Sequence, residues 1–238
     1  MRKSQRESQA TGSPSRPSRR ESQAARRQRA LAVAERMDAR YPDAQCALHF
    51  SNPFTLTIAV LLSAQTTDVA VNKVTPQLFA RWPTPAAMAA AEPAELEPIL
   101  KSIGLYRSKA RNCVACARTL MAEFAGEVPR SIPELMRLPG VGRKTANVVQ
   151  NNAFGIVEGI AVDTHVFRIA HRLGFSPAAS DTPEKVERDL LALYPPERWG
   201  PINHQWVLFG REVCIARRPR CPTCPLTELC PSATAVSH

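Results

Sequence analysis

The sequence predicts an all-α protein, and three observations lead to that prediction. No segment alternates apolar and polar residues for long enough to make a convincing strand. Residues that cap helices recur ahead of runs with helical spacing. The 238 residues include 21 prolines but only 10 glycines, which suits many short helices joined by stiff connections. We therefore expect helices in nearly every periodic segment from about residue 28 onward.

Several helix starts carry clear capping signals. A proline follows Asn52 and an apolar run follows the proline, so residues 54–64 are expected to form a buried helix. Ser131 and Thr182 are each followed by a proline and a glutamate, which is a first-turn pattern. Asp163 separates an apolar segment from the next expected helix, where it can serve as the N-cap.

Residues 105–124 place apolar side chains at helical spacing, which predicts an amphipathic helix. Cys113 and Cys116 lie in this apolar stripe with no second cysteine pair beside them. We therefore interpret both residues, and the lone Cys46, as packing residues rather than metal ligands.

Positive charge is concentrated near the N-terminus. Residues 1–29 contain nine Lys or Arg against two Glu, a net charge of +7, whereas residues 30–238 have a net charge of only +3. Ser, Gln, Arg and Pro dominate residues 1–27, which predicts a disordered tail; residues 233–238 are expected to form a second tail. The basic tail could bind phosphate non-specifically, act only as a solubilising extension, or serve as an organelle transit peptide.

The longest apolar run, at residues 58–62, is far too short to cross a bilayer, and no apolar signal-peptide segment is present. We therefore expect a cytoplasmic protein without a membrane segment. In such a reducing compartment, clustered thiols bind metal more often than they form disulfides, and the odd number of cysteines, seven, agrees with this.

Four cysteines close to the C-terminus are spaced C-x6-C-x2-C-x5-C: Cys214, Cys221, Cys224 and Cys230. Zinc sites usually draw their ligands as two close pairs, but only the middle two residues form such a pair. A [4Fe–4S] cluster needs one thiolate at each of four corners, which suits a single wrapping segment. The spacing therefore favours a [4Fe–4S] cluster, although spacing alone does not exclude zinc.

A glycine-rich segment, Leu138-Pro139-Gly140-Val141-Gly142-Arg143-Lys144, lies between the expected helices 131–137 and 143–154. Two glycines one residue apart can make a tight turn with outward-facing amides, directly before a helix N-terminus. The segment resembles a helix-hairpin-helix motif, which binds a DNA phosphate without reading sequence. The glycines are too close together for a Walker-type nucleotide loop.

Lys144 and Asp163 are the candidate catalytic residues. Lys144 stands in the first turn of a helix, where the positive end of the helix dipole disfavours an ammonium and so favours a nucleophilic amine. A carboxylate held beside such a lysine can accept a proton or stabilise a developing cation, and this role is compatible with helix capping by Asp163.

Taken together, the hairpin, Lys144, Asp163 and the four-cysteine loop make the chain similar to the endonuclease III family of helix-hairpin-helix DNA glycosylases, over about residues 28–232. The resemblance implies two all-α domains with DNA between them. A six-helix barrel domain would take residues 46–156. Residues 28–45 and 157–232 would form the [4Fe–4S] cluster domain.

The resemblance also implies roles for individual residues. Lys144 would be the Schiff-base nucleophile and Asp163 the essential carboxylate. Gln65 would fill the gap left by an extruded base, and Leu105 would wedge between bases. The other expected DNA-binding residues are Leu138, Gly140, Val141, Gly142, Arg143, Arg217, Arg218 and Arg220.

The implied activity is that of a bifunctional DNA glycosylase and AP lyase acting on oxidised pyrimidines in duplex DNA. Adenine-mismatch glycosylases lack the hairpin lysine, and they carry a catalytic glutamate in the segment where this chain has residues 62–65, Leu-Ser-Ala-Gln. Residues 154–159, before Asp163, are slightly longer than the family pattern. We expect a monomeric, nucleoid-associated enzyme with duplex DNA as its partner; a non-catalytic DNA-binding module is the competing hypothesis.

Overall fold

The computed structural model describes residues 21–233, and every regular element in that range is a helix, as the sequence predicted. None of these helices combines the length and the apolar character needed to cross a membrane. In chain order the elements are α1 (Gln23–Arg40), α2 (Pro53–Leu62), α3 (Asp68–Arg81), α4 (Pro85–Ala89), α5 (Pro93–Leu100), α6 (Tyr106–Glu123), α7 (Ile132–Leu135), α8 (Arg143–Phe154), α9 (Thr164–Arg172), α10 (Pro183–Leu193), η1 (Pro196–Arg198), α11 (Trp199–Glu212), η2 (Cys221–Thr223) and η3 (Thr227–Leu229).

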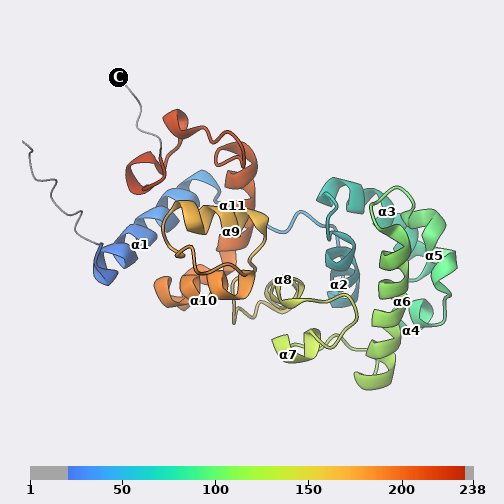
Figure 1. The fold of residues 1–238 in the computed structure, drawn as a ribbon. Helices are drawn as coiled ribbons and strands as arrows, with labels where there is room; N and C mark the ends of the chain where they lie inside the picture. The colour runs from blue at the N-terminus through green and yellow to red at the C-terminus, as the bar shows by residue number, and fades with distance from the viewer. Residues whose placement is uncertain (1–20, 234–238) are drawn as a thin grey trace, which may run out of the picture.

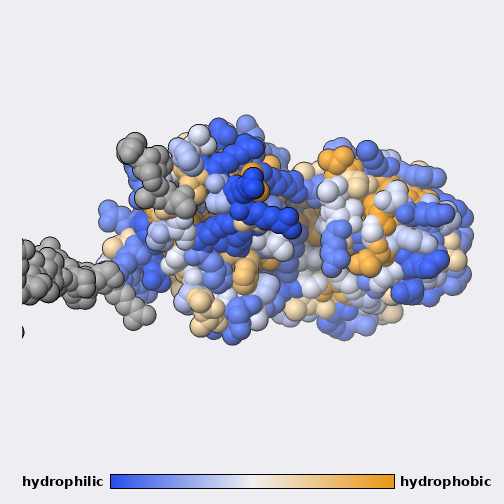
Figure 2. Space-filling view, turned by 45° about the horizontal axis from the view of Figure 1, so that its top comes forward, coloured by the Kyte–Doolittle hydropathy of each residue, from blue (hydrophilic) through white to orange (hydrophobic). Residues whose placement is uncertain are grey.

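The buried apolar side chains form two separate clusters. One cluster is built by α2 to α8 and includes the fully buried Leu56, Leu78 and Leu120. The other is built by α1 and α9 to α11, around Trp206 and Phe209. These helices lie on two sides of the molecule, with α8 near the junction (Figure 1). We infer that the clusters are the cores of two domains, which meet at a shallow waist in the space-filling view (Figure 2).

The two domains are not consecutive halves of the chain, because α1 packs with the C-terminal helices rather than with α2. Residues 46–156, which were expected to hold six helices, hold the seven helices α2 to α8, two of which (α4 and α7) are only five and four residues long. The predicted caps are present: side-chain oxygens of Asn52, Ser131 and Thr182 accept backbone amides in the first turns of α2, α7 and α10.

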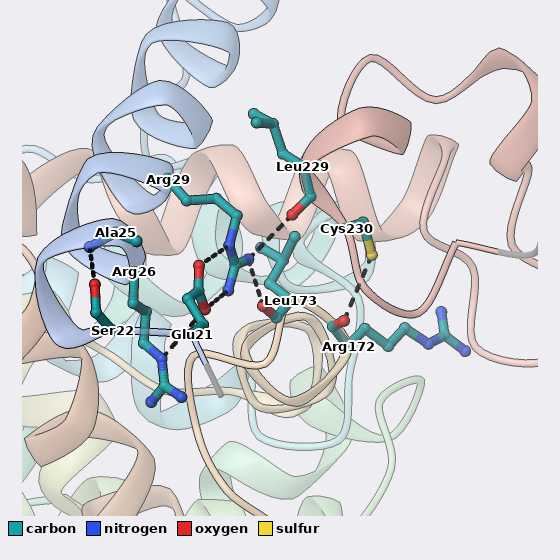
Figure 3. A network of polar contacts seen from close by, with 9 residues as sticks. All are labelled: Glu21, Ser22, Ala25, Arg26, Arg29, Arg172, Leu173, Leu229 and Cys230. Atoms are coloured by element: carbon teal, nitrogen blue, oxygen red, sulfur yellow. Dashed lines mark hydrogen bonds and ion pairs between the residues drawn. The ribbon is translucent and has the colours of Figure 1, made fainter. Parts of the chain in front are cut away.

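One boundary of the predicted N-terminal tail is wrong. Residues 1–20 lie outside the described part of the chain, but residues 23–27 are helical, because α1 begins at Gln23 with Ser22 as its N-cap. Arg29 bonds the Glu21 carboxylate and also donates to the carbonyl oxygens of Leu173 and Leu229, at 2.7 and 3.0 Å (Figure 3). Arg29 therefore anchors α1 to two distant segments rather than remaining solvated.

Cys113 and Cys116 are buried in the first cluster, as predicted. Burial raises the pKa of Cys116 to about 12, so its thiol stays protonated and unreactive at neutral pH. Cys46 also packs against this cluster, as predicted, although it is only half-buried and contributes to the wall of a pocket described below.

Candidate active site

The glycine-rich hairpin between α7 and α8 exposes main-chain amides. Gly140 has a φ of +82°, and a Cβ added there would lie 3.0 Å from Leu61 and 3.1 Å from Asn112, so only glycine fits. Gly142 is the N-cap of α8 and has no side chain to cap the helix. Within residues 21–233, neither glycine's amide has a protein acceptor. The hairpin therefore offers free N–H groups to an anion.

Leu138 and Val141 have a different part in this hairpin. Both side chains are buried, and the Val141 amide donates to the Leu138 carbonyl oxygen at 3.0 Å. Leu138 in turn donates its own amide to Leu135. These two residues hold the turn against the first cluster, and their side chains cannot themselves reach a ligand.

Arg143, which was expected to bind DNA, forms an ion pair inside the protein. Its Nε and Nη2 donate to the carboxylate of Glu187 on α10, at 2.5 and 3.2 Å. Only 5% of the Glu187 side chain is exposed, compared with 39% of the Arg143 side chain. This pair joins the start of α8, beside Lys144, to the second cluster.

Lys144 and Asp163 line one pocket, although they are 19 positions apart in the sequence. Asp163 caps α9: its Oδ1 accepts the amides of His165 and Val166 at 2.8 and 2.9 Å. Both bonds use the same oxygen, which leaves Oδ2 available to other groups. Lys144 forms no ion pair with any described residue, so its amine is also available.

The pocket lies between the two clusters. Val60 and Asp68 come from the first set of helices, whereas Asn203, His204 and Arg211 come from α11. Arg211 Nη2 lies 3.2 Å from Asp68 Oδ2, so an ion pair joins the two sets at the pocket. A substrate atom in this pocket would contact residues from both domains.

His204 is a titratable neighbour of the two candidate catalytic residues. Burial lowers its pKa, and the positive charge of Lys144 lowers it further, whereas Asp68 and Asp163 raise it. Because the net shift is downward from about 6.5, the imidazole is neutral at neutral pH and can act as a hydrogen-bond donor or acceptor.

Gln65 and Leu105 lie on two neighbouring loops and are exposed. Leu105, at the N-cap of α6, has 60% of its surface in solvent, which is unusual for a large apolar residue. Both residues adopt left-handed backbone conformations, with φ angles of 53° and 59°. Leu105 is therefore no core residue, and Gln65 is no buried polar group.

The four cysteines of the C-terminal loop line one small pocket of about 40 Å³, with apolar walls that include Ile169 and Phe209. Arg172 ties this loop to α9, because its Nη1 donates to Cys214 Sγ at 3.2 Å and its Nη2 to Ala216 O at 2.6 Å. At the end of this loop, Cys230 Sγ donates to the Arg172 carbonyl oxygen at 3.4 Å (Figure 3).

No group of three or more His, Cys, Asp or Glu side chains in residues 21–233 lies close enough together to hold a single metal ion. Four thiolates around one zinc at about 2.3 Å would be only about 3.8 Å apart. The four thiols line the walls of one pocket without meeting at one point. Burial raises the pKa of Cys224 and of Cys230, so a cationic centre in this pocket would favour their thiolate forms.

Arg217, Arg218 and Arg220 are all exposed on this loop, and none of them pairs with an acidic residue in the described part of the chain. The loop thus presents a cluster of free positive charge. The sequence had indicated these three residues, but it gave no sign of Asp68, His204 and Arg211 as pocket residues, since each stands in an ordinary helical pattern.

Known proteins resemble this chain over most of its length. The family model for the HhH-GPD superfamily of base excision DNA repair proteins matches residues 58–196. Endonuclease III of Escherichia coli K12 is 47% identical over 200 residues, covering 84% of this chain and 93% of its own length. Endonuclease III of Synechocystis is 46% identical, covering 89% of this chain and 96% of its own length.

A solved structure of a trapped covalent intermediate between an endonuclease III and DNA superposes with a TM-score of 0.82 at 48% identity, covering 87% of this chain and 96% of that chain. A non-covalent complex of an endonuclease III with DNA matches equally well. With the hairpin, the lysine, the carboxylate and the cysteine loop all present in this fold, the chain belongs to the HhH-GPD superfamily of base excision DNA repair proteins, within its endonuclease III branch.

Proposed function

We propose that this protein is a bifunctional DNA glycosylase and AP lyase of base excision repair, acting on oxidised pyrimidines in duplex DNA. The observation that carries the proposal is the shared pocket of Lys144 and Asp163, beside a helix N-terminus with free amides. A nucleophilic amine, a carboxylate and a phosphate-binding turn are the groups that cleavage at a deoxyribose requires.

Duplex DNA is held by its phosphates. The free amides of Gly140 and Gly142 and of the first turn of α8 donate to the oxygens of one phosphate, and Arg217, Arg218 and Arg220 attract others. These interactions bind any sequence, which suits a protein that searches for damage. Arg143 contributes by fixing α8 through Glu187.

The damaged nucleotide must leave the base stack before the pocket can receive it. Extrusion costs a few kcal/mol and is easiest for a badly stacked base, which favours lesions over intact bases. Leu105 enters the stack as an apolar wedge, and Gln65 fills the gap with a group that can bond the orphaned partner base.

The chemistry follows from the two pocket residues. The unprotonated Lys144 amine attacks C1′, and the glycosidic bond breaks as the base leaves with its electron pair. Asp163, held by its capping bonds, stabilises the positive charge that develops on the sugar and takes part in proton transfer. The attacking nitrogen then loses a proton and the C1′–O4′ bond opens, with a proton passing to O4′, which gives an imine between Lys144 and the opened sugar. This imine makes the 2′ proton acidic, and its removal expels the 3′ phosphate by β-elimination; hydrolysis of the imine by water then frees Lys144.

A [4Fe–4S] cluster is the cofactor that the cysteine loop fits best, with Cys214, Cys221, Cys224 and Cys230 as its ligands. Its contribution would be structural, since it would hold Arg217, Arg218 and Arg220 in place. Zinc is the alternative, and iron analysis with a visible absorption spectrum distinguishes the two. We further propose that the enzyme works as a cytoplasmic monomer associated with the nucleoid.

Borohydride trapping tests the proposed function, because only an enzyme that forms an imine becomes covalently attached to DNA. Wild-type protein is expected to be trapped on a duplex with an oxidised pyrimidine. Lys144→Gln is expected to bind this duplex but to lose strand cleavage and trapping. Lys73→Gln makes the same chemical change at an exposed residue outside the pocket and should behave as wild type. Normal trapping by Lys144→Gln would refute the mechanism; binding without trapping by wild type would indicate a non-catalytic DNA-binding module.

A further inference from the structure

A buried lysine connects the two loops that carry Gln65 and Leu105. Lys109 lies in the first turn of α6, four residues after Leu105, and only 4% of its surface is exposed. Its Nζ donates a hydrogen bond to Thr66 Oγ1 at 2.5 Å. Because Thr66 directly follows Gln65 in the chain, this hydrogen bond connects the loop that carries Gln65 to the helix start that carries Leu105.

Each loop is also held locally. The Thr66 amide donates to Ser63 O at 3.0 Å, and its hydroxyl can donate to Ala64 O at 3.4 Å while it accepts from Lys109. On the other side, the Lys109 amide donates to the carbonyl oxygen of Leu105 at 3.0 Å. The Lys109–Thr66 bond therefore links two turns that are already internally bonded.

The main chains of the loops approach one another directly. A Cβ added at Gly104 would lie 3.9 Å from the carbonyl oxygen of Gln65, which is van der Waals contact. Gln65 and Leu105 both have left-handed backbones, a conformation that residues other than glycine rarely adopt. Such strained conformations persist only where the surroundings hold them, and they concentrate at functional sites.

Stability gives no reason for a lysine at this position. An ammonium carries three donors, and in residues 21–233 only Thr66 accepts one of them. Burial lowers the pKa of Lys109, although the Cys113 thiol acts in the opposite direction. Replacing a buried charge by an apolar side chain of similar size is often neutral or stabilising. With one hydrogen bond for three donors, this lysine contributes little to the stability of the fold.

We propose that Lys109 is a positioning residue which, through Thr66, holds Gln65 and Leu105 together as one preformed wedge for DNA. The inference rests on the proposed role of these two side chains in base extrusion. A wedge that is already ordered loses less conformational entropy on binding than two independent loops. Lys109 touches neither the pocket of Lys144 and Asp163 nor the reacting atoms.

The test uses a duplex with an oxidised pyrimidine opposite 2-aminopurine, whose fluorescence rises when it is unstacked. The variants are Thr66→Val, which keeps the shape but removes the acceptor, Lys109→Met, and the double variant; Thr66→Ser keeps the hydroxyl as a control. Excision is measured in single turnover. Cleavage of a preformed abasic site in single-stranded DNA reports the pocket alone, because no stack must be opened there.

Thr66→Val and Lys109→Met are expected to slow excision from the duplex by about tenfold or more, as for loss of a charged hydrogen bond. The fluorescence rise should shrink in parallel, while single-strand cleavage stays at the wild-type rate. Thr66→Ser should restore both duplex signals, and the double variant should be no worse than Lys109→Met alone, because both changes remove the same bond.

Two results would overturn the proposal. Wild-type excision and fluorescence in Thr66→Val would show that the bond does not matter, and equal losses on both substrates would show damage to the fold or pocket instead. A variant with both Gln65→Ala and Leu105→Ala separates failure of the Lys109 inference from failure of the proposed function. If the Gln65→Ala, Leu105→Ala variant keeps the fluorescence rise, these two side chains do not open the base stack, and the proposed function loses this step. If this variant loses the fluorescence rise but Thr66→Val and Lys109→Met keep it, only the proposed role of Lys109 is refuted.

Discussion

Replacing Glu187 by alanine tests how the hairpin is fixed to the second domain. Glu187 is buried and accepts bonds from three residues: Arg143, Asn147 through Nδ2 at 3.0 Å, and the Ile160 amide at 3.3 Å. These partners lie on α8 and on the segment that leads to Asp163. The carboxylate therefore joins the Lys144 helix to α10.

The expected cost follows from what the alanine variant leaves behind. Two buried donors, on Asn147 and Ile160, lose an acceptor, and each unsatisfied group costs about 1–3 kcal/mol. Loss of the bond to Arg143 adds less to this free-energy cost, because 39% of the Arg143 side chain is exposed and its guanidinium can be hydrated instead. We expect a loss of about 3 kcal/mol, which for a protein of this size lowers the melting temperature by about 6–12 °C.

Far-UV circular dichroism during heating measures this loss. Glu123→Ala is the matched control, since Glu123 pairs with Arg137 at the surface, where the two side chains are 42% and 57% exposed; its loss should stay below about 1 kcal/mol. Glu187→Gln keeps one carbonyl acceptor, so its melting temperature should lie between those of Glu187→Ala and Glu123→Ala. If Glu187→Ala melts within the range of Glu123→Ala, the buried network does not hold the hairpin.

Three further predictions concern the pocket, the cysteine loop and the N-terminus. Asp163→Asn should lose most base excision in single-turnover assays but melt near the wild-type temperature, because asparagine caps a helix about as well as aspartate. Cys221→Ser should lose iron and visible absorbance and bind DNA more weakly, whereas Cys113→Ser, in the first core, should keep its iron. Deleting residues 1–20 removes six Lys or Arg and should lower the log–log salt slope of DNA binding by about 0.9 for each phosphate that these residues neutralise, with catalysis on short duplexes unchanged.

Each of these predictions has a contradicting outcome. Full turnover by a poorly stable Asp163→Asn variant would make the carboxylate structural only. One zinc and no iron in protein purified without oxygen would replace the cluster by zinc, but would leave Lys144 and Asp163 in their roles. An unchanged salt slope would mean that residues 1–20 do not bind DNA. The deletion stops at residue 20 because Ser22 caps α1 and Glu21 pairs with Arg29.

Much of the local structure follows from neighbouring residues, and there the sequence was sufficient. Helix starts at Asn52, Ser131 and Thr182 depend on a side chain and an amide a few positions apart, so capping patterns predict them. The hairpin glycines and the cysteine loop are also local, since tight turns and short spacings constrain them. Lys144 and Asp163 could be singled out one by one for the same reason.

The tertiary structure decided what these residues face. Only packing of α11 against the first domain brings Asp68, His204 and Arg211 into the pocket. Arg143 has the charge expected of a DNA-binding residue, but folding places Glu187 against it, 44 positions away. Lys109 resembles any helix-surface lysine in sequence, yet folding buries it under Thr66, 43 positions away. Local patterns determine which backbone forms and which groups it can carry; long-range packing determines which groups are buried, paired or free to react.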